Sequence, residues 1–147
     1  CMAAQCANHV GVGSRKVYNY RLNNAGSGLT NFKVVMGTNA LWNTKNIGNK
    51  LVHPTKRLKA AVNYHIWSCY HFILMLITAT NSKQEYAKEY EECLVQTKAM
   101  LPSVLLRSEV TWKHKIKMIL ITMFPITYAK YIIKKNRKAL EKDLKNL

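Results

Sequence analysis

The chain has 147 residues, about one domain's worth, and 48% of them are hydrophobic, which is enough for a packed core. Its formal net charge of +16 favours an anionic partner such as nucleic acid, lipid headgroups or a nucleotide phosphate. The four cysteines form no CxxC pair and lack the Cys/His spacing of a zinc site, which excludes the common zinc motifs. Two of them fall on apolar helical faces, as buried free thiols do, so we expect a reducing, cytoplasmic compartment.

The N-terminal residues predict a connection to a preceding domain. The sequence begins with Cys1, and residues 1–10 lack the basic start and apolar run of a signal peptide, so we expect a piece of a longer protein. Residues 14–21 form the one credible strand, because Val17, Tyr18 and Tyr20 favour extended backbone. A single strand is not stable alone, so it should pair with a sheet that precedes it.

The turn after this strand combines groups that suit a phosphate. Its Asn and Gly residues tolerate positive φ, so the chain can turn tightly and aim backbone N–H groups at an anion. Arg21 adds a guanidinium, and Ser27 and Thr30 add hydroxyls. The alternative is an ordinary loop between strand and helix with a surface arginine.

The sequence after Phe32 predicts helices, and the region 54–80 is the strongest of them. An earlier helix is expected over 31–46, ended by Gly48, and Pro54 suits the first turn of the next. Residues 66–77 are apolar nearly all round, as in a central core helix or a membrane span. Polar residues interrupt the stretch, and a span needs about 20 predominantly apolar residues, so a buried helix is favoured.

A third helix is predicted from Ser82, with Glu85 completing a capping box. The link to the preceding helix is short, so the two should be antiparallel. Pro102 should bend or end this helix. Its inward stripe is expected to contain Tyr86, Tyr90, Cys93, Leu94, Thr97 and Leu101.

The C-terminal third predicts two more helices, separated at Pro125. The first should face inward with Trp112, Ile116, Ile119, Leu120 and Met123. The second has an apolar side with Tyr128, Tyr131, Ile132, Ala139, Leu140 and Leu144. Its opposite side carries Lys130, Lys134, Lys135, Arg137, Lys138, Lys142 and Lys145. This pattern fits a helix lying on an anionic membrane surface, and a solvated lysine face is the alternative. Nucleic acid is disfavoured, because aromatic residues are not interleaved as stacking platforms.

No constellation in the chain predicts catalysis. The seven acidic residues lie mostly beside lysines, and the five histidines do not cluster in sequence. We find no P-loop, nucleophile elbow or dinucleotide fingerprint. The segment alone should therefore be inactive.

Residues 16–21 with 27–31 resemble the C-terminal end of the catalytic domain in glycosyltransferase family 2. Residues 125–128 with the lysines that follow resemble the basic helical tail that commonly comes after that domain. The resemblance implies a parent with an α/β nucleotide-binding domain of the GT-A type. Such a parent would transfer a sugar from a nucleotide-diphosphate donor using a divalent metal, Mg or Mn, whose ligands lie outside this sequence. It also implies that Arg21, Ser27 and Thr30 lie over the donor diphosphate.

Taken together, these features predict a mainly α protein: a helical bundle that follows a short strand and turn belonging to a preceding GT-A domain. Residues 1–31 would end that catalytic domain. Residues 32–147 would form an accessory region, peripheral on the inner membrane face, in an enzyme of surface polysaccharide synthesis. A second hypothesis is a basic helical module that binds an anionic membrane or an acidic partner without any transferase. A third is an integral membrane protein with spans at 60–80 and 116–133.

Overall fold

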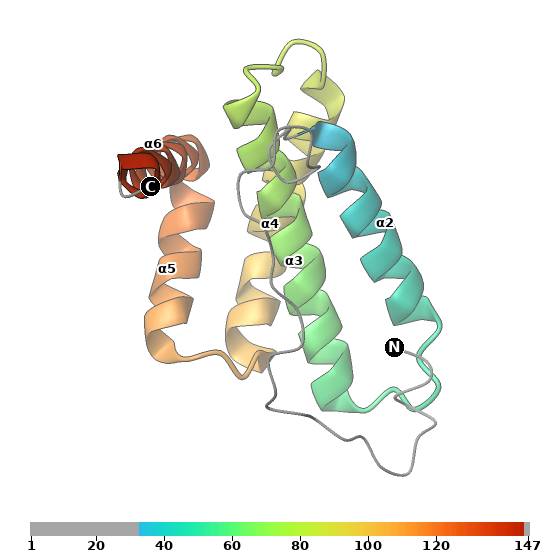
Figure 1. The fold of residues 1–147 in the computed structure, drawn as a ribbon. Helices are drawn as coiled ribbons and strands as arrows, with labels where there is room; N and C mark the ends of the chain where they lie inside the picture. The colour runs from blue at the N-terminus through green and yellow to red at the C-terminus, as the bar shows by residue number, and fades with distance from the viewer. Residues whose placement is uncertain (1–32, 146–147) are drawn as a thin grey trace, which may run out of the picture.

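The computed structural model describes the backbone of residues 33–145 and the side chains of residues 33–135. Five helices make up this part, which contains no strand: α2 (Val34–Asn49), α3 (Lys56–Ala79), α4 (Ala87–Arg107), α5 (Trp112–Met123) and α6 (Pro125–Lys145) (Figure 1). The predicted mainly α bundle is confirmed for these residues. The predicted strand at 14–21, its turn and the domain boundary at 31/32 lie outside them.

Helix α3 is the centre of the bundle and contacts α2, α4 and α6. One side of it contributes Tyr70, Ile73 and Ile77 to a core shared with Val34 of α2 and Cys93 of α4. Within residues 33–145, α3 is the one helix long and apolar enough to cross a membrane, and the sharply bent α5–α6 pair would count as a second only if taken as one span. The helices around α3 bury 44% of its most apolar stretch, so the choice between a core helix and a membrane span stays a prediction.

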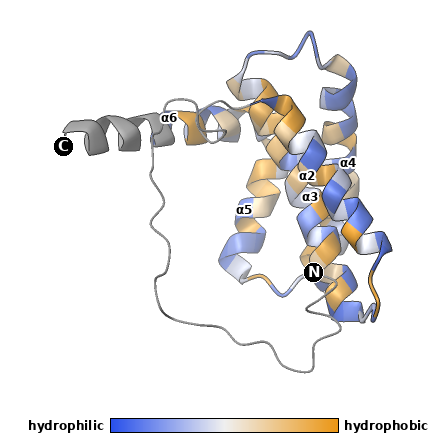
Figure 2. Ribbon diagram, turned by 45° about the vertical axis from the view of Figure 1, so that its right-hand side comes forward, coloured by the Kyte–Doolittle hydropathy of each residue, from blue (hydrophilic) through white to orange (hydrophobic). Residues whose placement is uncertain are grey.

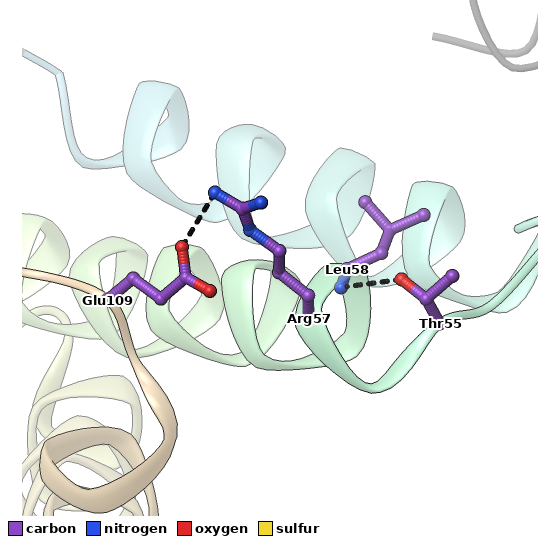
Figure 3. A network of polar contacts seen from close by, with 4 residues as sticks. All are labelled: Thr55, Arg57, Leu58 and Glu109. Carbon is purple, nitrogen blue, oxygen red and sulfur yellow. Dashed lines mark hydrogen bonds and ion pairs between the residues drawn. The ribbon is translucent and has the colours of Figure 1, made fainter.

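The start of α3 is fixed by a threonine cap. The Thr55 hydroxyl oxygen accepts a hydrogen bond from the Leu58 N–H at 3.1 Å, which satisfies one of the free donors of the first turn (Figure 3). Pro54 therefore precedes the cap, whereas the sequence placed it in the first turn.

The link between α3 and α4 corrects the predicted capping box. Helix α4 begins at Ala87, and its N-cap residue Tyr86 makes no side-chain cap bond. The residues of the predicted box instead help to end α3: the Ser82 N–H donates to the Ile77 carbonyl at 3.1 Å, and Asn81 adopts a φ of 53°. Asparagine tolerates this left-handed conformation, which commonly ends a helix. Downstream, α4 continues through Pro102, and its predicted stripe is buried at Tyr90, Cys93 and Thr97.

Gly37 allows α2 to approach α3 closely. A Cβ atom at this position would lie 2.7 Å from the Ile73 Cγ1 and 3.1 Å from the Leu76 Cδ1, and both of those side chains are fully buried. We expect Gly37→Val to lower the free energy of unfolding by about 2–3 kcal/mol, because a packed core resists extra volume. Urea unfolding followed by circular dichroism measures this change. Asn39→Val, on the exposed side of α2, is the control, and an equal loss in both variants would contradict the close approach.

Candidate membrane-binding surface

The apolar stripe of α5 points outward, which is the reverse of the sequence prediction. Trp112, Leu120 and Met123 are 67%, 55% and 62% exposed, and Ile116 and Ile119 are exposed as well. The buried residues of this helix are Met118, Ile121 and Thr122. The helix is thus amphipathic as predicted, but the more apolar side faces away from the bundle.

The rotation of α5 is set by an aromatic side of α3. The Tyr64 hydroxyl lies 2.8 Å from the His114 Nε2, and Met118 packs in a core with Trp67 and Val104. His114 and Met118 are four residues apart and so share one side of α5. Because that side is held against α3 and α4, the stripe on the other side is left without a partner among the described residues.

Helix α6 turns away from α5 at a sharp corner. The two helices are bent by 112° at Phe124, which is 59% exposed. Pro125 begins α6, where its missing N–H costs no helical hydrogen bond. Ala129, 1% exposed, packs in the interior, and the Tyr128 ring lies 5.6 Å from the His71 ring of α3. The corner is therefore held in place from α3.

Exposed apolar side chains gather along α5 and around this corner. We call this set the α5–α6 apolar surface: Ile116, Ile119, Leu120, Met123, Phe124 and Ile126. The stretch of α5 that leads to the corner is coloured as hydrophobic in Figure 2. A contiguous exposed patch of this kind marks a site of contact with a membrane or another protein.

Lysines flank this surface on both helices. The helical repeat places Lys113 and Lys117 along one edge of the α5 stripe and Lys115 along the other. On the predicted basic side of α6, Lys130, Lys134 and Lys135 are all exposed, and their contact with an anionic surface stays a prediction. Three further predicted residues lie on α6 beyond the described side chains: Arg137, Lys138 and Lys142. The α5 lysines were not among the predicted site residues, because that helix was expected to face inward.

Tyr131 departs from the predicted apolar side of α6. It is 59% exposed and shares the outward side with the lysines, whereas Tyr128 and Ile132 are partly buried. A tyrosine in this setting suits a membrane interface, because its ring is apolar and its hydroxyl is polar.

His71 of α3 packs against α6. Its ring stacks on Trp67 with centroids 6.1 Å apart and also faces Tyr128, over which the Lys117 Nζ lies 5.6 Å from the ring centroid. Burial, with a smaller effect of the Lys117 charge, lowers the pKa of His71 from 6.5 to about 4. The imidazole is therefore neutral at physiological pH.

The two described cysteines, Cys69 and Cys93, are buried free thiols, as expected from the sequence. Burial, with a smaller effect of nearby glutamates, raises the pKa of the Cys93 thiol to about 12, so this cysteine is not a ready nucleophile. Within residues 33–135, no three His, Cys, Asp or Glu side chains come together as metal ligands.

The predicted donor-binding residues Arg21, Ser27 and Thr30 lie outside the described residues, so their role stays a prediction. The resemblance to glycosyltransferase family 2 and its divalent metal stay predictions. The chain has no significant match to a protein-family model, to a curated protein or to a solved structure.

Proposed function

We propose that this chain is a helical module that binds peripherally to an anionic membrane surface through the α5–α6 apolar surface and its flanking lysines. One observation carries the proposal. The apolar stripe of α5 faces outward and meets the lysine-bearing side of α6 at an exposed corner. A lipid interface offers acyl chains to apolar side chains and anionic headgroups to lysines, so a surface that carries both kinds of side chain suits it.

The expected energies are large enough for reversible attachment. Each lysine near an anionic leaflet contributes about 1 kcal/mol, and apolar burial contributes about 25 cal/mol per Å². The exposed Lys130, Lys134 and Lys135 act together with at least three exposed apolar side chains. Neither term needs a helix to cross the bilayer, because an interfacial helix buries its apolar side only about 5–10 Å deep.

A second copy of the chain is a less suitable occupant of this surface. The net charge of +16 and the lysines around the patch would repel an identical surface. An acidic protein partner would satisfy the lysines, but lysine is depleted in protein interfaces relative to the rest of the protein surface. The mixture of lysine and apolar residues therefore favours lipid.

Vesicle sedimentation tests the proposal. We expect binding to mixed phosphatidylserine–phosphatidylcholine vesicles and little binding to phosphatidylcholine alone. Replacing Lys130, Lys134 and Lys135 together with glutamine should weaken binding by about 3 kcal/mol, roughly a hundredfold, because three surface charges are lost.

The matched control for this experiment replaces three exposed lysines elsewhere, Lys50, Lys88 and Lys98, with glutamine. It removes the same net charge and should change binding much less. Equal losses in both variants would mean that overall charge, and not the α5–α6 apolar surface, attracts the membrane.

The glycosyltransferase hypothesis is compatible with this function but rests on other residues. The resemblance implies a helical accessory region at a membrane after residue 32, and the membrane-binding module would fill that role. The module does not depend on the transferase, since its evidence comes from α5 and α6 alone.

A further inference from the structure

A basic cleft is lined by residues from the start of α3 and the end of α4. This end of the bundle lies away from the corner between α5 and α6 (Figure 1). The volume of the cleft is ≈ 580 Å³. Its lining comes from α3, α4 and the link that follows α4: Lys56, Arg57, Lys59, Ala60, Asn63, Arg107 and Glu109. Four cationic side chains thus share the cleft with a single carboxylate.

The spacing of these residues explains how they meet. Lys56, Lys59 and Asn63 recur at helical intervals, so they share one side of the first two turns of α3. Arg107 is the last residue of α4, which runs antiparallel to α3 and so ends beside those turns. The cleft brings together segments that are nearly fifty residues apart in sequence.

The carboxylate in the cleft is paired with one of the arginines. The Arg57 Nη2 and the Glu109 Oε2 are 2.7 Å apart, and the two side chains are 80% and 62% exposed (Figure 3). A solvent-exposed ion pair is weak, because water and salt screen it. An incoming anion with more charge than one carboxylate can therefore displace Glu109 from Arg57.

We propose that this cleft binds a soluble small molecule that carries at least two phosphate groups. Its volume is in the range of small-molecule sites. Two guanidiniums can each fork onto phosphate oxygens, and two lysines add point charges. The Asn63 amide can donate a further hydrogen bond.

The position of the cleft favours a soluble anion over a lipid headgroup. Lys59 precedes His71, the residue that contacts α6, by twelve positions, or about 18 Å along α3. This separation exceeds the Debye length of about 8 Å at physiological salt, so the charge of a bilayer at the α6 end would be largely screened from the cleft. When the α5–α6 apolar surface rests on a bilayer, the cleft remains in water. The two sites can therefore be tested independently.

Isothermal titration calorimetry of the whole chain with inorganic triphosphate tests the proposal. We expect saturable binding of one triphosphate per chain at physiological salt. Arg57→Ala and Arg107→Ala should each weaken binding by roughly tenfold, since each removes a charge-assisted contact. Glu109→Gln should strengthen it several-fold, because it frees Arg57 and removes the competing carboxylate. Arg57 and Arg107 are chosen because they do not line the neighbouring hollow beside α2, which Lys59 and Asn63 share.

Matched controls separate the cleft from general charge. Lys98→Ala and Glu91→Gln make the same net charge changes at exposed positions of α4 away from the cleft. Unsaturable binding, or controls that change affinity as much as the cleft variants, would overturn the proposal. Vesicles containing phosphatidylinositol bisphosphate form the second arm. If Arg107→Ala weakens binding to those vesicles and leaves triphosphate binding unchanged, the ligand is a lipid headgroup and the soluble assignment is wrong.

Discussion

Replacing Leu120, Met123 and Phe124 together with serine should weaken binding to anionic vesicles by about 3 kcal/mol, roughly a hundredfold. All three side chains are more than half exposed in the free protein, at 55%, 62% and 59%. Inserting each one into a bilayer interface should contribute about 1 kcal/mol, less than the value for complete burial. Because the residues face outward, the free energy of unfolding should change little. Vesicle sedimentation and urea unfolding measure the two quantities.

A control variant on the other side of the bundle separates the α5–α6 apolar surface from exposed apolar residues in general. Val35, Trp42 and Ile47 are exposed apolar residues of α2, at 51%, 68% and 41%. Their joint replacement with serine removes similar apolar area and should leave vesicle binding nearly unchanged. If the α5–α6 variant binds as well as the native chain, the apolar surface is not a lipid contact.

Acid should weaken the fold through His71. The pKa of this imidazole is about 4 in the folded protein and 6.5 in the unfolded chain, so the unfolded chain binds the proton more tightly. The stability that depends on neutral His71 is complete above pH 6.5 and is lost as the pH falls towards 4. The full loss corresponds to about 3 kcal/mol.

Urea unfolding of the native chain and of His71→Phe across this pH range isolates the effect. Phenylalanine keeps an aromatic ring between Trp67 and Tyr128 but cannot take up a proton. The native chain should lose about 3 kcal/mol more than the variant between pH 7 and pH 4. His65→Phe, at an exposed position of the same helix, should behave like the native chain. Parallel curves for the native chain and His71→Phe would mean that His71 is not the group responsible.

The sequence predicted the helices better than it predicted their orientation. Periodicity identified the apolar stripe of α5. It does not show which surface covers that stripe, because the residues that pack against α5 are distant in sequence. Here Tyr64 and Trp67 of α3 engage the opposite side through His114 and Met118. Likewise, the residues Ser82 to Glu85 have the sequence pattern of a capping box for α4. In the fold, the Ser82 N–H instead donates to the Ile77 carbonyl at the end of α3, so the tertiary structure overrides the local preference.

For the candidate sites too, features of a single helix could be predicted, whereas features that depend on how helices pack could not. The lysines of α6 could be predicted because they repeat along one helix and face solvent. The cleft at Arg57 and Arg107 could not, because its residues meet only once α3 and α4 lie antiparallel. The hypothesis about Arg21, Ser27 and Thr30 concerns residues that the structure does not describe, so it stays a prediction.

The corner at Phe124 also determines how the molecule would stand on a bilayer. Helix α6 has 21 residues, so it would lie along the lipid headgroups for about 32 Å. At a bend of 112°, α5 rises steeply from that base, so the part of its apolar stripe that reaches the lipid is the part next to the corner, at Leu120, Met123 and Phe124. Because α6 would contact the membrane along its length and α5 would stand at a steep angle to it, the protein would adopt one tilt on the membrane. Any domain attached to it would then lie at a constant distance from the bilayer.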